Sequence, residues 1–255
     1  MTKLNYELLG NTSNRVLVLS NGLGTHLQMW DRVLPHLLPH FRILRYDVRG
    51  HGRSILKDDI SPRTIEILGN DMIDLLGHLG IERIHFCGIS MSGLIGQWLA
   101  LQHPQRIEKL ILSNTGAKIG EKALWDARIL TIRQEGLSAI ADATMERWFT
   151  EDFLKNDAEQ VRSIKSMFLQ NDVEAYSACC AAIRDADFRA EIGRIEHPVL
   201  IIHGEQDAVT TFEHAEYLRS HINRSSLVSL KTRHLAPVEL PQLYATKIVH
   251  FLKPS

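Results

Sequence analysis

The sequence predicts an α/β fold with a mostly parallel β-sheet and a helical segment inserted before the last strands. Short apolar runs recur along the chain with helical stretches between them, and this alternation is typical of parallel sheets. The runs are almost continuously apolar, as expected of strands that helices cover on both faces. They lie at 16–20, 42–46, 84–87, 109–113, 199–203 and 227–230, and a first strand is expected within Leu4 to Leu9.

Residues 114 to 195 interrupt this alternation, because they have the pattern of amphipathic helices without a convincing core strand. The expected helices cover 122–134, 137–148, 158–171 and 173–185. An insertion after a strand of an open α/β sheet lies above the carboxyl ends of the strands, where ligands bind. We therefore expect a single domain over residues 1–255, with a core at 1–115 and 196–255 and a helical cap at about 116–195.

The composition argues against several classes of function. With 29 basic and 30 acidic residues, the chain has no net attraction toward nucleic acid or an anionic membrane. Its first residues lack the basic and apolar regions of a secretory signal, and no apolar run is long enough to span a bilayer. Three cysteines without Cys-x-x-Cys spacing favour a reducing cytoplasm over a disulfide framework or a zinc site.

A serine after the run 84–87 gives the strongest chemical signal. The following segment, Gly-Ile-Ser-Met-Ser-Gly at 88–93, predicts that a strand passes through a tight turn into a helix. A serine in such a turn crowds the positions two before and two after it, and both must be small. Gly88 and Ser92 satisfy this condition for Ser90, whereas Leu94 would clash if Ser92 were the nucleophile. The pattern therefore favours Ser90 as the nucleophile.

This segment resembles the nucleophile elbow of the α/β-hydrolase family, whose usual pattern is Gly-x-Ser-x-Gly, with Ser92 at the position of the last glycine. The resemblance implies an α/β-hydrolase fold with a mostly parallel, eight-stranded sheet, flanking helices and a helical cap. It also implies a serine, acid and histidine triad in that chain order. No cofactor is expected, because the sequence has neither a defensible metal-ligand spacing nor a Gly-rich phosphate motif.

The triad needs a base for the weakly acidic hydroxyl and a carboxylate that orients the base. Asp207 follows the run 199–203 at the position of the family's acid and is preferred to Glu205. His234 lies after the last expected strand, where the family has its base. Two other histidines, His203 and His221, remain less favoured candidates.

Two backbone N–H groups usually stabilise the oxyanion of acyl transfer. Met91 N–H directly follows the nucleophile at the start of a helix, where the helix dipole favours negative charge. The segment 21–25, Asn-Gly-Leu-Gly-Thr, resembles the family's His-Gly-x-Gly loop and implies Leu23 N–H as the second donor. Residues 47–54 also match a family signature, but we expect them to build a turn beside the site.

Three longer stretches narrow the resemblance. Ser20–Asp31, Gly136–Thr150 and Tyr176–Asp187 are similar to the 3-oxoadipate enol-lactonases and include parts of the expected cap. This resemblance implies a carboxylic-ester hydrolase that opens 3-oxoadipate enol-lactone to 3-oxoadipate, a step of the β-ketoadipate pathway of aromatic catabolism. Another hydrolase of this fold, such as a carboxylesterase or a C–C bond hydrolase, and a ligand-binding receptor without turnover remain alternatives.

The implied substrate carries a carboxylate, so the cap should offer a cation or an indole N–H in a largely apolar pocket. Five cap residues have suitable side chains: Trp125, Arg128, Arg133, Arg147 and Trp148. Trp125 and Arg133 are favoured, with Trp148 as a third choice.

Overall fold

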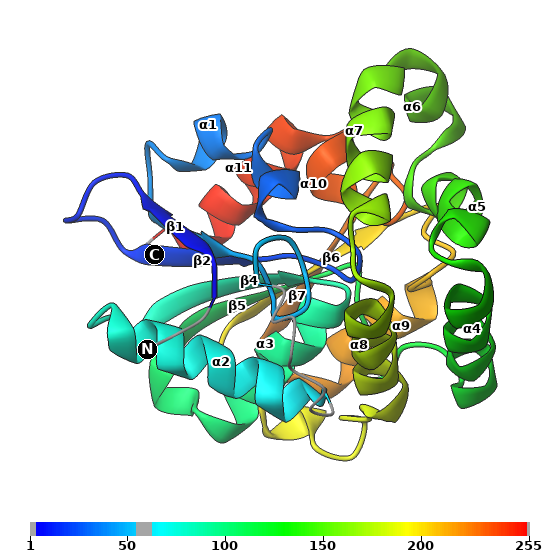
Figure 1. The fold of residues 1–255 in the computed structure, drawn as a ribbon. Helices are drawn as coiled ribbons and strands as arrows, with labels where there is room; N and C mark the ends of the chain where they lie inside the picture. Colours follow the sequence, from blue (N-terminus) through cyan, green and yellow to red (C-terminus); the bar gives the residue numbers. More distant parts are fainter. Residues whose placement is uncertain (1–3, 55–62, 254–255) are drawn as a thin grey trace.

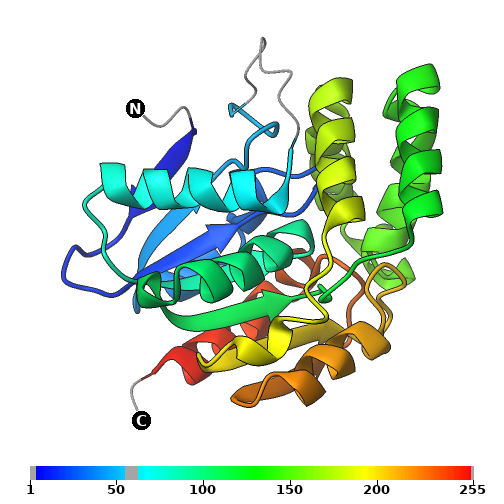
Figure 2. The same cartoon turned by 90° about the horizontal axis from the view of Figure 1, so that it is seen from below.

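The computed structural model describes residues 4–54 and 63–253, which form a seven-stranded sheet between layers of helices (Figures 1 and 2). The strands lie in the order β1-β3-β2-β4-β5-β6-β7, with β1 antiparallel to β3 and all other pairs parallel. Their bounds are β1 (Tyr6–Leu9), β2 (Val16–Ser20), β3 (Arg42–Tyr46), β4 (Ile84–Ile89), β5 (Ile107–Ser113), β6 (Val199–Gly204) and β7 (Ser225–Leu230). Each apolar run of the sequence is one of these strands.

The expectation of eight strands is corrected to seven for the described part of the chain. Only the family resemblance implies an eighth strand, because the apolar runs of the sequence, together with the first strand within Leu4 to Leu9, predict seven strands.

Helices cover both faces of the sheet. On one face lie α2 (Ile65–His78), α3 (Met91–Gln102) and α9 (Phe212–His221), and on the other lie α1 (Leu34–Leu37) and α11 (Pro241–Leu252) (Figure 1). The short helix α10 (Ala236–Glu239) precedes α11, and three 3₁₀ turns lie at Leu27–Trp30, Pro104–Arg106 and Ile192–Arg194. None of the described helices combines the length and the apolarity needed to cross a membrane.

Five helices between β5 and β6 form what we call the cap. They are α4 (Lys122–Glu135), α5 (Ser138–Trp148), α6 (Glu151–Asn156), α7 (Ala158–Leu169) and α8 (Val173–Asp185). In Figure 2, α4 and α8 stand side by side beyond the ends of the strands, and α5 packs against α7. Sequence periodicity did not predict α6, because six residues are too few for a helical pattern; its start is set by Thr150, whose side chain accepts a hydrogen bond from Phe153 N–H.

The parallel strands determine where chemistry can occur. Six neighbouring strands, β3, β2, β4, β5, β6 and β7, run in the same direction, so their carboxyl ends meet at one edge of the sheet. The loops that leave this edge contain the residues expected to form the site, and the cap lies over them.

Candidate active site

Ser90 lies in a strained turn between β4 and α3. Its φ of 55° and ψ of −118° are unfavourable for a residue with a Cβ. Thr115 Oγ1 donates a hydrogen bond to the Ser90 carbonyl at 2.8 Å, and Ser90 N–H donates to Ser113 O at 3.0 Å. A Cβ at position 88 would lie 2.1 Å from the Ser92 carbonyl oxygen, so only glycine fits there. The surrounding structure therefore holds the serine in a conformation that it would not adopt in isolation.

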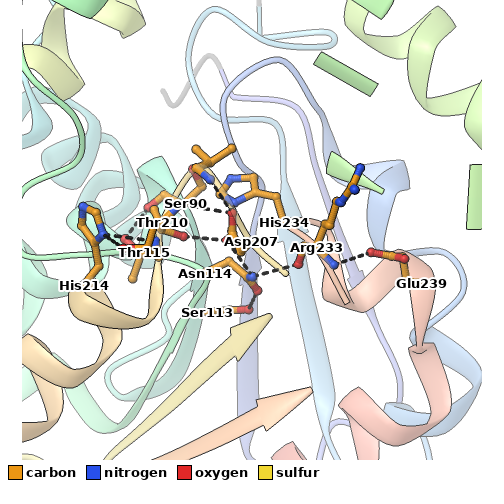
Figure 3. A network of polar contacts seen from close by, with 12 residues as sticks. Ser90, Ser113, Asn114, Thr115, Asp207, Thr210, His214, Arg233, His234 and Glu239 are labelled. Carbon is orange, nitrogen blue, oxygen red and sulfur yellow. Dashed lines mark hydrogen bonds and ion pairs between the residues drawn. The ribbon is translucent and has the colours of Figure 1, made fainter. Parts of the chain in front are cut away.

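Asp207 and His234, which the sequence selected as acid and base, form a buried pair (Figure 3). His234 Nδ1 lies 2.8 Å from Asp207 Oδ2. Since the ionised carboxylate can only accept, the proton of this hydrogen bond belongs to His234 Nδ1, and Nε2 of the neutral ring is left as a proton acceptor. The pair thus has the arrangement required of an oriented base.

Four further hydrogen bonds fix Asp207. Asn114 Nδ2 donates to Oδ2 at 3.0 Å and Thr210 Oγ1 at 2.7 Å, while the N–H groups of Val209 and Thr210 donate to Oδ1 at 2.8 and 3.1 Å. Burial alone would raise the pKa of this carboxyl, but the interaction with His234 and the hydrogen bonds from Asn114 and Thr210 outweigh it and hold the pKa well below its usual range. Asp207 therefore remains ionised.

Local sequence patterns do not point to Asn114 or Thr210. Asn114 directly follows β5 and has a φ of 44°, so its side chain turns toward Asp207 from a neighbouring strand. A polar residue at the end of a predicted strand was the available signal for Asn114, but its partner lies 93 positions away in the chain. Only the strand order places the two residues together.

The loop that holds His234 is attached to the cap. Arg233 N–H donates to Glu239 Oε1 at 2.8 Å, and Thr150 Oγ1 donates to Glu239 Oε2 at 2.6 Å (Figure 3 shows the Arg233 contact). On the other side of His234, Leu235 N–H donates to Trp148 O at 3.1 Å. Hydrogen bonds on both sides of His234 therefore connect its loop to the end of α5 and the start of α6.

The loop 21–25 presents Leu23 at the site. The Gly22 carbonyl accepts hydrogen bonds from Thr25 N–H at 3.2 Å, Thr25 Oγ1 at 2.9 Å and Asn21 Nδ2 at 3.1 Å. Because a peptide unit is planar, fixing this carbonyl also fixes the direction of Leu23 N–H. Met91, the other expected donor, is the first residue of α3 and adjoins Ser90.

Ser90 and His234 line a pocket of about 290 Å³ beneath the cap. Its walls are mainly apolar, with two arginines and one tyrosine. The lining residues are Leu23, Ser90, Ile119, Gly120, Leu124, Trp125, Arg128, Arg147, Trp148, Tyr176, Ile183, Ala208, Val209 and His234. Within residues 4–54 and 63–253, including this pocket, no group of three or more His, Cys, Asp or Glu side chains could hold a metal ion.

The structure corrects the choice of Arg133 as a substrate-binding residue. Arg133 is not among the lining residues and instead forms a 2.7 Å ion pair with Glu174, in which both side chains are more than half exposed. Arg133 is five residues beyond Arg128 on α4, a rotation of roughly 140° about the helix axis. Arg128 therefore faces the pocket while Arg133 faces solvent.

Both tryptophans line the pocket. The indole N–H of Trp125 donates to Ile119 O at 2.7 Å, so Trp125 supplies an apolar wall and not a free donor. Trp148 packs edge-to-face against Phe168 of the cap.

Two arginines give the pocket a positive charge. Arg128 donates to Tyr176 OH at 2.7 Å and to Thr144 Oγ1 at 3.3 Å, but has no carboxylate partner among the described residues. Arg147 likewise has no ion pair within the described ranges. Partial desolvation and the nearby charge of Arg128 both lower the pKa of Arg147. An anion bound beside these side chains would relieve their mutual repulsion.

His51 is hydrogen-bonded to the loop 21–25. Its Nε2 accepts a hydrogen bond from Gly24 N–H at 2.9 Å, and its ring is completely buried. Burial lowers the pKa of His51 to about 4. The histidine is therefore neutral near pH 7 and accepts the hydrogen bond.

We expect His51 to make the protein less stable in mild acid. The unfolded chain takes up a proton at His51 below about pH 6.5, whereas the folded protein does so only near pH 4. Stability is therefore fully present above pH 6.5 and is lost as the pH falls toward 4, with a slope approaching about 1.4 kcal/mol per pH unit. Chemical denaturation of wild type and His51→Gln between pH 7.5 and 5 measures this slope. Glutamine can accept the Gly24 bond but does not titrate, and equal slopes in both proteins would contradict the assignment.

Comparisons with known proteins agree with this fold. Residues 15–240 match the family model described as the alpha/beta hydrolase fold. The chain is 42% identical to 3-oxoadipate enol-lactonase 2 of Acinetobacter baylyi over 94% of its own length and 90% of the relative. Among solved structures, the enol-lactonase from Burkholderia xenovorans LB400 has a TM-score of 0.94 at 39% identity and covers 98% of this chain and 96% of its own. A hydrolase from Pseudomonas aeruginosa PA01 has a TM-score of 0.94 at 42% identity and covers 98% and 94%.

The family match extends over β2 to β7, the loops at their carboxyl ends and the cap between them. The chain belongs to the α/β-hydrolase fold family.

Proposed function

We propose that this protein is a serine hydrolase that opens 3-oxoadipate enol-lactone to 3-oxoadipate. The observation that carries the proposal is a pocket lined by the elbow serine, by His234 with its buried partner Asp207, and by two arginines that have no carboxylate partner among the described residues. Such a pocket suits a small ester that bears an anionic group. The relatives named as enol-lactonases, which match the chain over nearly its full length, support this choice of substrate.

The reaction proceeds through an acyl-enzyme. Ser90 Oγ attacks the lactone carbonyl while His234 Nε2 takes the hydroxyl proton, and the N–H groups of Leu23 and Met91 stabilise the oxyanion. The ring C–O bond then breaks, His234 returns the proton to the leaving enol oxygen, and the enol becomes the ketone. Water, activated by His234, hydrolyses the ester to Ser90 and releases the second carboxylate of 3-oxoadipate.

The substrate's own carboxylate binds Arg128 and Arg147. Arginine provides several N–H donors in a plane that matches a carboxylate, and the apolar walls around these two residues strengthen the attraction. Arg128 is held by Tyr176 and Thr144. Arg147 also lines the pocket and has no ion-pair partner among the described residues.

Arg147→Met is expected to lower kcat/KM for the enol-lactone by about 10- to 100-fold, since a hydrogen bond to a charged group contributes about 1.5–3 kcal/mol. A neutral aryl ester has no carboxylate and should lose much less. Arg133→Met is the matched control, because it removes an arginine of the cap that lies outside the pocket. Equal losses on both substrates would show that Arg147 does not bind the carboxylate.

The substrate assignment is tested by following the absorbance of the enol-lactone beside hydrolysis of an aryl ester and of a dienone. We expect the largest kcat/KM for the lactone. A higher value for the aryl ester would indicate a general carboxylesterase, preference for the dienone would indicate a C–C bond hydrolase, and ligand binding without turnover would indicate a receptor. We also assign the reaction to the cytoplasm, where three buried, unpaired cysteines are stable as thiols.

A further inference from the structure

Ser92 occupies the position where the usual elbow has glycine, and its hydroxyl is fully buried. The Ser92 hydroxyl donates a hydrogen bond to the carbonyl oxygen of Asn21, the first residue of the loop 21–25. It also accepts a hydrogen bond from the hydroxyl of Ser20 at 2.8 Å. The side chain that replaces glycine therefore connects α3 directly to the loop that contains Leu23.

The hydroxyls of Tyr46, Ser20 and Ser92 form a chain of hydrogen bonds in which each group donates to the next. Each hydroxyl has a single proton, and the proton of Ser20 is used toward Ser92. The contact of 2.8 Å between Ser20 Oγ and Tyr46 OH must therefore have Tyr46 as its donor. Burial raises the pKa of Tyr46, so this phenol keeps its proton. The chain runs from Tyr46 through Ser20 and Ser92 to the Asn21 carbonyl, and such aligned hydrogen bonds strengthen one another.

The connection fixes one oxyanion donor relative to the other. Met91 N–H belongs to the first turn of α3, next to Ser92, and Leu23 N–H belongs to the loop that begins at Asn21. The hydrogen bond from the Ser92 hydroxyl to the Asn21 carbonyl joins these two backbone segments. Without its hydroxyl the buried Asn21 carbonyl loses this donor, and an unsatisfied buried polar group costs about 1–3 kcal/mol. The loop would relieve that cost by shifting, which would move Leu23 N–H.

We propose that Ser92 is a positioning residue that holds the two oxyanion donors at the spacing required by the transition state. The proposal rests on the serine mechanism proposed above but does not depend on the choice of substrate. Ser92 touches no reacting atom, so its effect is exerted through the direction of Leu23 N–H.

The test is Ser92→Ala, assayed on p-nitrophenyl acetate so that it is independent of the lactone. We expect kcat to fall roughly 10-fold, less than the 10²–10³-fold cost of deleting an oxyanion donor, with KM within about twofold of wild type. Affinity for a trifluoromethyl ketone, which forms an anionic hemiketal with the serine, should fall by the same factor as kcat.

Further variants separate positioning from a general loss of stability. Ser20→Ala and Tyr46→Phe interrupt the same chain farther from the elbow and should lower kcat in the same direction, so they carry the test if Ser92→Ala does not fold. Adding Ser20→Ala to Ser92→Ala should cause little additional loss. Ser177→Ala is the matched control, because it removes a buried hydroxyl that bonds within its own helix to Val173 O.

Two results would overturn the proposal. One is wild-type kcat and wild-type ketone affinity in a folded Ser92→Ala protein, even if its melting temperature falls. The other is an equal loss of kcat in Ser177→Ala. Failure of the lactone assay in wild type would refute only the proposed substrate, because labelling of Ser90 by a fluorophosphonate and turnover of the aryl ester report on the serine mechanism separately.

Discussion

Replacement of Ser90 by alanine is expected to lower kcat by about 10⁴- to 10⁶-fold, the largest effect of any single change in this protein. The hydroxyl is the only group in the proposed mechanism that forms a covalent bond to the substrate. Alanine keeps the Cβ and the strained backbone, so the fold around the site should be preserved. Rates of aryl ester and lactone hydrolysis measure the loss, and a fluorophosphonate should no longer label the protein.

Ser90→Gly provides a matched variant that separates activity from stability. Glycine adopts a φ of 55° without steric cost, so this protein should be as inactive as Ser90→Ala but more stable, by about 1 kcal/mol. The expected result is loss of catalysis together with a raised melting temperature. If either variant kept a rate within tenfold of wild type, Ser90 would not be the nucleophile.

Asp207→Asn should lower kcat by about 10⁴-fold, a larger loss than we expect for any variant described above except those of Ser90. Asp207 accepts five hydrogen bonds, three at Oδ2 and two at Oδ1. An asparagine amide must place its NH₂ group at one of these two positions. If NH₂ faces His234, Nδ1 must become an acceptor, and the proton moves to Nε2, where the base is needed. If NH₂ faces the N–H groups of Val209 and Thr210, donors oppose donors.

Asp207→Asn therefore should also be less stable than wild type, unlike the Ser90 variants. Thr210→Val is its control, because it removes one donor to Oδ2 and leaves the acid and His234 in place. We expect Thr210→Val to lose far less activity, as measured by kcat on the aryl ester. Comparable rates in the two variants would show that the carboxylate does not orient the base.

Local patterns predicted much of the fold and the positions of the proposed triad. A strand that ends in a serine between small residues can form few other turns, and the structure brings Ser90, Asp207 and His234 to one edge of the sheet. Contacts that depend on strand order were not accessible from the sequence. Asn114 and Thr210 complete the environment of Asp207 from different segments of the chain, and neither stands out in the sequence by itself.

The cap was harder to interpret for a geometric reason. A difference of a few residues along α4 decides whether an arginine faces the pocket or the solvent, and Arg133 and Arg128 illustrate both outcomes. The proposed role of Ser92 was also not predictable from the sequence. The two groups that its hydroxyl contacts, Ser20 Oγ and Asn21 O, belong to β2 and to the loop that follows it.

The connections between the cap and the His234 loop limit how a ligand can exchange. Swinging α5 away from the core would break the bonds of Leu235 to Trp148 and of Glu239 to Thr150, and would displace the base at the same time. At α4, by contrast, Leu124 both lines the pocket and is 69% exposed, so the pocket meets solvent there. Exchange at α4 would leave the base in place, so α5 could remain fixed while it forms a wall of the pocket.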